Sequence, residues 1–127
     1  MKIKDVILSK SYTGFFFDDQ KAIKAGARRD GMHYIGQPII DGFKSIRQKG
    51  EAISIQLILD NDMVGVGDCA AVQYSGTGGR DPLFLADDYI PYIKKHIVPM
   101  LVGEEVNNFK SLSEKYDQLF IEGKRLH

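Results

Sequence analysis

The residues with the strongest potential for chemistry lie in one glycine-rich stretch, 67–82. It leaves a run of small residues and presents Gln73, Tyr74, Ser75 and Arg80 among glycines. Glycine lets a backbone approach a ligand closely, and N–H groups at the start of a following helix can bind an anion. No Gly-Lys-Ser/Thr sequence follows, and the glycine spacing matches no dinucleotide motif. The pattern therefore leaves open a ligand-contacting loop, an independent phosphate site and a plain surface connection.

The carboxylates and histidines elsewhere predict no complete active site and no metal site. Asp18 and Asp19, like Asp87 and Asp88, are neighbours whose side chains diverge on a strand or a helix. We interpret each pair as a helix start, where negative charge is stabilising. A lone histidine base stays open, although no spacing puts two histidines on one helical face: they are His33, His96 and His127. No Ser or Cys lies in a recognisable nucleophile turn.

Composition narrows the class of protein. The chain has 127 residues with 17 basic and 17 acidic side chains, so it lacks the basic surface of a nucleic-acid-binding protein. No window approaches the roughly 20 apolar residues of a membrane span, and no signal-peptide core is present. The single cysteine, Cys69, cannot form an internal disulfide, and we expect it to be a buried small side chain. We expect one cytoplasmic globular domain.

We expect strands and helices to position the glycine-rich stretch, and strands come first along the chain. Residues 1–10 predict a strand, after which the pattern breaks at 13–19 and Asp18 is expected to cap a short helix that ends near Gly26. Residues 27–49 predict a long irregular excursion. Alternating apolar residues around an Asp-Asn-Asp turn predict a β-hairpin over 52–72. Together these strands predict a three-stranded antiparallel sheet with one apolar face to be covered.

Helices are expected to cover that face. Asp88 is predicted to cap a helix with Pro91 in its first turn, which Pro99 kinks or ends and Gly103 closes. Its apolar stripe consists of Ile90, Ile93, Ile97 and Leu101.

A second helix is predicted from a capping box at 111–114, and it is expected to stop at Gly123. Its buried residues are expected to be Leu112, Tyr116, Leu119 and Phe120. The fold class is therefore α+β, a three-stranded antiparallel meander followed by a helical segment.

Four blocks of sequence resemble one known family. They are TGFFFDDQ at 13–20, RQKGE at 47–51, GDCAAVQYSG at 67–76 and GRDPLFLA at 79–86. They resemble the N-terminal region of the methylaspartate ammonia-lyases, members of the enolase superfamily, and the resemblance covers essentially the whole chain. It implies that 1–127 is a single capping domain, a meander followed by helices. The catalytic barrel would then lie outside this chain, as an attached domain or a separate subunit.

The same resemblance implies a function. The family eliminates ammonia from 3-methylaspartate to give mesaconate, and its barrel binds magnesium on three carboxylates and supplies the lysine and histidine acid-base groups. A divalent cation would stabilise the enolate-like charge that forms after proton removal. This chain would then hold no catalytic residue and no metal ligand. It would be inactive alone, and it would shape the substrate pocket and exclude water.

The resemblance also implies site residues. Gln73 is similar to the family glutamine that approaches the amino group of the amino-acid substrate, and an amide carbonyl can accept a hydrogen bond from an ammonium. Residues 13–19 would form the other lip of the pocket. Packing of two of the three residues 15–17 in the core is an equally open reading. The alternative function is a free-standing protein-interaction module with the cap fold, whose uncovered face could recruit a partner or self-associate.

Overall fold

A computed structural model describes residues 1–70 and 83–125, and the chain divides into two compact units. The first unit comprises Met1–Leu8, Ile55–Gly67 and Pro91–His127. The second unit comprises Ser9–Ser54 and Asp68–Ile90.

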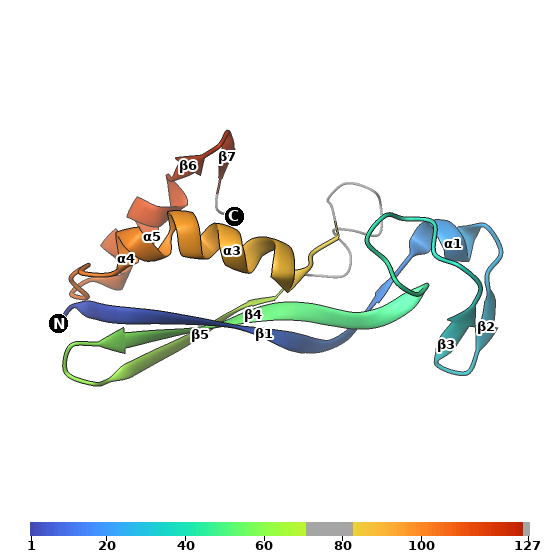
Figure 1. Cartoon of the computed structure of the whole chain (residues 1–127), viewed down its shortest axis with the longest axis horizontal. Coiled ribbons are helices and arrows are strands. Elements are labelled where there is room, and N and C mark those ends of the chain that lie inside the picture. Colours follow the sequence, from blue (N-terminus) through green and yellow to red (C-terminus); the bar gives the residue numbers. More distant parts are fainter. Residues whose placement is uncertain (71–82, 126–127) are drawn as a thin grey trace. The chain divides into compact units, whose positions relative to one another are not determined.

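A three-stranded sheet has the order β1-β4-β5 (Figure 1). Its strands are β1 (Ile3–Asp18), β4 (Arg47–Leu59) and β5 (Val64–Ala70). The turn between β4 and β5 contains Asp62 with φ 65°, a conformation that aspartate tolerates. The predicted hairpin and the α+β class are confirmed, with β4 starting five residues earlier than expected.

Strand β1 is longer than predicted. The break expected at 13–19 is wrong, because β1 continues through the three phenylalanines to Asp18. Gly14, which suggested the break, lies inside the strand with φ 77°, as glycine does at a bulge. The three phenylalanines thus lie on a strand of the sheet and not in a loop.

Helix α1 (Gln20–Lys24) is capped by Asp19, so the predicted cap at Asp18 is off by one residue. The Asp19 carboxylate accepts from the N–H of Ala22 at 3.1 Å, while Asp18 pairs with Arg47. The helix ends before Gly26, as predicted.

The predicted irregular excursion contains a small hairpin. Strands β2 (Arg28–Asp30) and β3 (His33–Ile35) pair antiparallel across a two-residue turn. Gly31 takes φ 59° at the first turn position, which favours glycine. Strands of three residues are too short to give a recognisable alternation, so only 36–46 matches the prediction of irregular structure.

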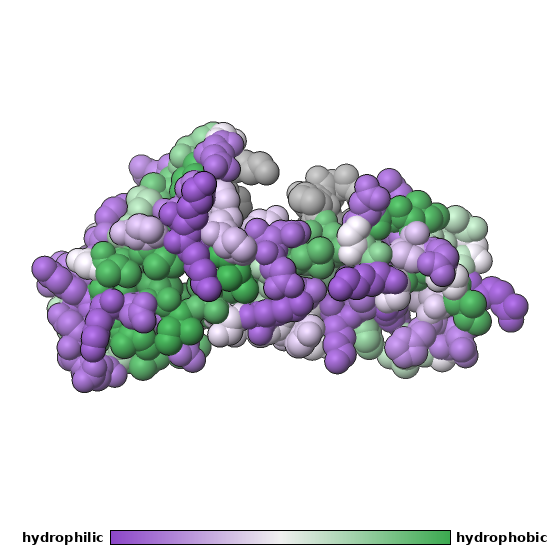
Figure 2. Space-filling view, in the orientation of Figure 1, coloured by the Kyte–Doolittle hydropathy of each residue, from purple (hydrophilic) through white to green (hydrophobic). Residues whose placement is uncertain are grey.

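The first unit has an apolar core formed by Ile3, Val6 and Leu59. Partly buried residues pack against this core: Leu8, Ile55, Leu57, Val98, Leu101 and Val106. On β5, Val64 and Val66 are 52% and 71% exposed. Figure 2 shows apolar residues gathered over the end of the molecule that carries the β4–β5 turn.

Helix α3 (Ala86–His96) starts two residues before the predicted cap at Asp88. Asp87 and Asp88 lie in its first turn, as expected of a helix start. Pro91 lies inside the helix and not in its first turn, so that prediction is wrong. Because proline has no N–H, the helix lacks the bond from residue 91 to the carbonyl of Asp87.

The helical segment breaks near Pro99, as predicted. Helix α4 (Val98–Leu101) has Pro99 in its first turn, and it ends before Gly103. Among the described helices, none is long and apolar enough to cross a membrane.

The second predicted helix is shorter than expected. Helix α5 (Phe109–Asp117) is capped by Asn108, which accepts from the N–H of Ser111 at 3.2 Å, so the capping box is wrong. The helix does not continue to Gly123, because β6 (Phe120–Ile121) and β7 (Lys124–Arg125) form a hairpin. Its two turn residues both have positive φ.

This hairpin changes what the segment buries. Phe120 is 64% exposed, so its predicted burial is wrong. The other residues predicted for this face are half-buried: Leu112, Tyr116 and Leu119.

Candidate functional site

The predicted substrate contact, Gln73, lies outside the described residues, as do Tyr74, Ser75 and Arg80. The site is therefore built from the described residues of the second unit that flank the segment 71–82. We call Ser54, Asp68, Glu51, Ala86 and Lys10 the flanking network.

Asp68, near the end of β5, is held by a side-chain hydrogen bond. The Ser54 hydroxyl on β4 donates to the Asp68 carboxylate on β5 at 2.7 Å. The same hydroxyl lies 3.3 Å from the hydroxyl of Ser11 on β1. A side chain of β4 thus binds β5 at Asp68, two residues before β5 ends at Ala70.

The start of helix α3 is capped by a carboxylate. Glu51 on β4 accepts from the N–H of Ala86 at 3.0 Å, at the first residue of α3. The Glu51 side chain is 12% exposed, and Ala86 is fully buried. An N–H in the first turn of a helix has no partner within the helix, so Glu51 supplies the cap.

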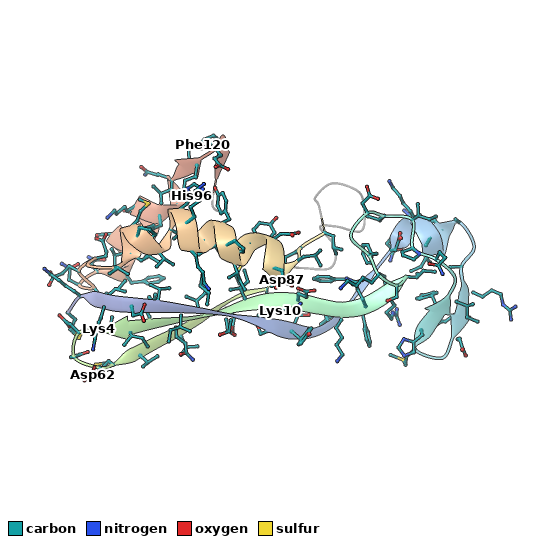
Figure 3. All side chains as sticks on the ribbon, viewed as in Figure 1. Lys4, Lys10, Asp62, Asp87, His96 and Phe120 are labelled. Carbon is teal, nitrogen blue, oxygen red and sulfur yellow. The ribbon has the colours of Figure 1, made fainter. Side chains whose placement is uncertain are left out.

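Lys10 balances the charge of this cap. Its Nζ lies 3.4 Å from an oxygen of Asp87, which Figure 3 labels beside it. The same Nζ lies 3.5 Å from a Glu51 oxygen. Desolvation lowers the pKa of Lys10, but the two carboxylates outweigh it and the pKa is raised. Lys10 therefore stays charged over the physiological range.

These residues border an open hollow of about 320 Å³. It is lined by Lys10, Tyr12, Gly42, Lys44, Gln48, Lys49, Glu51, Leu85, Asp87 and Asp88. Three lysines face three carboxylates, so the lining has no excess charge that would select an anion or a cation.

The three phenylalanines of β1 have different environments. Phe17 is buried at 4% exposure, and Phe16 is half-buried with the Arg47 guanidinium 5.1 Å from its ring centre. Phe15 is 67% exposed. Core packing accounts for Phe17 and in part for Phe16, which leaves Phe15 as the residue that could face a pocket.

Arg47 joins the end of the sheet to the β2–β3 hairpin. It binds Asp18 with two hydrogen bonds of 2.7 and 2.8 Å, and it donates to the carbonyl of Met32 at 3.0 Å. Its guanidinium also lies 5.0 Å from the ring centre of Tyr34. The hydrogen bonds with Asp18 raise the pKa of Arg47, so the guanidinium stays charged.

Asp19 organises the irregular 36–46 segment. One carboxylate oxygen accepts from the N–H groups of Ile39 and Ile40 at 2.5 and 2.8 Å, and the other accepts from Ala22. Asp19 is fully buried. Burial alone would raise the pKa of this carboxyl, but the backbone N–H groups outweigh it and the pKa is lowered.

The remaining predicted residues do not join this region. Cys69 is exposed on β5, so its predicted burial is wrong. His33 is exposed on β3, and Nε2 of His96 lies 3.4 Å from a Glu122 oxygen. His127 lies outside the described residues. Across 1–70 and 83–125, no group of three His, Cys, Asp or Glu residues could hold a metal ion.

Residue-level reasoning missed the roles of Arg47, Glu51 and Ser54. Arg47 and Glu51 lie in the RQKGE block, which drew attention only through its resemblance to a family. Their partners are 29 and 35 residues away along the chain, and no local pattern reports such a distance.

Comparison with known proteins identifies the family. The model of the family "Methylaspartate ammonia-lyase N-terminus" matches residues 1–127. The chain belongs to this family. The resemblance of the four sequence blocks is confirmed.

Relatives of known name agree with this assignment. The methylaspartate ammonia-lyases of Clostridium tetanomorphum and Citrobacter amalonaticus are 56% and 54% identical to the chain over 127 residues. In both cases the match covers 100% of this chain and 31% of the relative. The chain thus spans about a third of the length of these relatives.

Solved structures share the fold over the whole chain. A magnesium complex of β-methylaspartase from Clostridium tetanomorphum matches with a TM-score of 0.93 at 56% identity. The Citrobacter amalonaticus enzyme containing (2S,3S)-3-methylaspartic acid matches with a TM-score of 0.91 at 54% identity. Each match covers 100% of this chain and 31% of the other.

Proposed function

We propose that this chain is the capping part of a methylaspartate ammonia-lyase, an enzyme that eliminates ammonia from 3-methylaspartate to give mesaconate. The observation that carries the proposal is the 56% identity and TM-score of 0.93 to a solved methylaspartase over all of this chain. The other two-thirds of the enzyme would supply a barrel with the acid-base groups. Residues 1–127 would form one capping domain, because β1, β4, β5 and α3 each contribute residues to both units.

Magnesium would be bound by that other part of the enzyme. A relative is known as a magnesium complex, but the described residues of this chain bring no three suitable ligands together. The cation would stabilise the charge that develops when the proton next to the carboxylate is removed. This chain's own contribution would be to shape the pocket and to exclude water.

Within this chain, Gln73 would contact the substrate. Its amide oxygen can accept a hydrogen bond from the substrate ammonium without exchanging a proton. A glutamine at the same number has been replaced in a solved "mutant Q73A" of the Clostridium tetanomorphum enzyme, which is 55% identical to this chain. The magnesium complex and a variant changed beyond the length of this chain are both 56% identical. Losing one identical residue out of 127 lowers the identity by about this difference of one per cent. The difference therefore supports a glutamine in the Clostridium tetanomorphum enzyme that aligns with Gln73 of this chain.

The test uses the assembled enzyme, meaning this chain together with the remaining two-thirds found in its relatives. Gln73→Ala is expected to raise KM for 3-methylaspartate by roughly tenfold, because a hydrogen bond to a charged group is lost. Selectivity between ammonia and methylamine in the reverse reaction should also change. Gln56→Ala, an exposed glutamine on β4, is the matched control. Unchanged kinetics toward both amines would remove Gln73 from the site.

The chain alone is expected to release no ammonia from 3-methylaspartate, with or without magnesium. Release by the purified chain would contradict the proposed division between cap and barrel. Nothing in the described part of the chain favours the alternative of a free-standing interaction module.

A further inference from the structure

The C-terminal hairpin, β6–β7, is contacted near its turn by one face of helix α3 (Figure 1). The hydroxyl of Tyr92 donates to the carbonyl of Ile121 at 3.3 Å. Nε2 of His96, which Figure 3 labels, lies 3.4 Å from a carboxylate oxygen of Glu122. Tyr92 and His96 are four residues apart, so they lie on the same face of the helix, and their ring centres are 4.7 Å apart. We call these four residues the hairpin contact.

Glu122 is an unusual residue for its position in the turn. The two turn residues, Glu122 and Gly123, have φ 52° and 76°, so both adopt the left-handed backbone. Asparagine, aspartate and glycine are preferred at such a position, because they adopt this backbone at the lowest cost. Glutamate lacks this advantage. A residue that breaks a local preference is expected to have a compensating contact, and the carboxylate of Glu122 has one in His96.

The strength of this contact depends on the charge of His96. An imidazolium attracts a carboxylate at this distance much more than a neutral imidazole does. Histidine is the side chain whose charge ordinarily changes between pH 5 and pH 8. The contact between His96 and Glu122 is therefore expected to be stronger in mild acid than in mild base.

The other groups around His96 leave this sign unchanged. Among the described side chains, those that face it are the Glu122 carboxylate, from the hairpin, and the Tyr92 phenol, from its own helix. Phenols are neutral between pH 5 and pH 8. Lys94 and Lys95 lie on other faces of the helix, since residues one and two apart do not face each other.

We propose that the hairpin contact is a pH-sensitive attachment of the β6–β7 hairpin to helix α3. Protonation of His96 adds an ion pair at the turn, so the hairpin opens less often. Loss of the proton weakens that pair and leaves the hydrogen bond of Tyr92. The four residues lie in the first unit, and the inference does not depend on the proposed function.

Hydrogen exchange of residues 118–125 in the assembled enzyme tests the proposal. Protection factors, which are corrected for the intrinsic pH dependence of exchange, are compared at pH 8 and pH 5.5. We expect about threefold higher protection of the hairpin at pH 5.5, the size of effect that a partly exposed ion pair gives. His96→Gln and Glu122→Gln should each remove this difference. His33→Gln, at an exposed histidine on β3, is the control and should retain it.

Two further variants separate the ion pair from the fold of the turn. Glu122→Asn should keep the hairpin folded, because asparagine favours the left-handed backbone, and it should still remove the difference between the two pH values. Tyr92→Phe should lower protection by about threefold at both pH values and keep the difference, because only the hydrogen bond to Ile121 is lost.

Three outcomes would overturn the proposal. They are equal protection of the parent at both pH values, an unchanged pH difference in His96→Gln, and an unchanged pH difference in Glu122→Asn. Because exchange reports the opening of the hairpin and not catalysis, each of these outcomes can occur whether or not the proposed function is correct.

Discussion

The two units of the chain are stabilised by different kinds of interaction. In the first unit the buried centre is apolar, formed by Ile3, Val6 and Leu59, and the ion pairs Lys4–Asp62 and Lys110–Glu114 are exposed. In the second unit two carboxylates are buried, Asp18 and Asp19, and each is satisfied by directional hydrogen bonds. Apolar burial depends on area and tolerates small shifts, whereas buried charges require defined partners.

The difference follows the proposed division of labour. The second unit contains the flanking network, whose residues precede and follow the segment that carries Gln73 along the chain. We therefore expect substitutions of polar residues to have large effects in the second unit and small effects in the first.

The largest effect is expected at Asp19. Asp19→Asn should lower the free energy of unfolding by about 3 kcal/mol, because an amide NH₂ would face N–H donors that the carboxylate now satisfies. Asp62→Asn is the control, since Asp62 is exposed and asparagine also tolerates its positive φ. Urea denaturation measures the free energy of unfolding of both variants. A loss below about 1 kcal/mol at Asp19 would show that the buried carboxylate is not what holds 36–46.

Acid should weaken the second unit through the same group. The pKa of Asp19 is lower in the folded chain than the ordinary value of 3.8, so the unfolded chain binds its proton first. Its contribution to stability is then complete above about pH 4, and it is lost as pH falls through the folded pKa. The free energy of unfolding, measured from pH 7 to pH 2, should fall less steeply for Asp19→Asn than for the parent. Equal slopes would contradict the lowered pKa.

Arg47→Lys is expected to cost about 2 kcal/mol. Lysine keeps the charge but cannot make the paired bonds to Asp18 and also donate to the carbonyl of Met32. Hydrogen exchange should rise in the β2–β3 hairpin and not in the core of the first unit. Arg28→Lys, on exposed β2, is the matched control and should be nearly neutral. Similar losses for the two lysine variants would mean that the contacts of Arg47 with Asp18 and Met32 have no special role.

Gly50→Ala should cost between about 1 and 3 kcal/mol through overpacking. A Cβ at Gly50 would lie 2.6 Å from Oγ1 of Thr13 and 3.0 Å from the carbonyl oxygen of Phe15, so β1 and β4 would have to separate. At Gly67 a Cβ would meet nothing within 4 Å, and Gly67→Ala should be neutral or slightly stabilising. Thermal unfolding of the Gly50→Ala and Gly67→Ala variants compares their stabilities. A neutral Gly50→Ala would mean that the strands can move apart freely.

Much of the fold could be predicted from the sequence, because it depends on local patterns. The β4–β5 hairpin follows from alternation around an Asp-Asn-Asp turn, and the break before α4 follows from Pro99. The boundaries were less predictable. Helix α5 is capped by Asn108 and not by the expected capping box, and α1 is capped by Asp19 and not by Asp18. Several residues near the start of each helix could have served as the cap, and tertiary partners decided among them.

The candidate site was predictable only through family resemblance. Gln73 was identified by its block and lies outside the described residues, so its role remains a prediction. The hydrogen bonds of Glu51 and Ser54 could not be predicted, since their partners are brought near by the tertiary fold. Cys69 was expected to be buried because cysteine usually is, but it lies on an edge strand that exposes its side chains.

The smallest effect is expected for the ion pair of Lys4 and Asp62 in the first unit. Lys4→Gln should change the free energy of unfolding by less than about 0.5 kcal/mol, because both side chains are more than half exposed and water screens them. Lys10→Gln in the second unit should cost more, since it leaves the Glu51 carboxylate at 12% exposure without its cation. Raising the salt concentration should reduce the effect of Lys4→Gln more than that of Lys10→Gln. Equal costs, equally screened, would mean that Lys10 is an ordinary surface lysine and that the two units differ less in their electrostatics than their buried carboxylates imply.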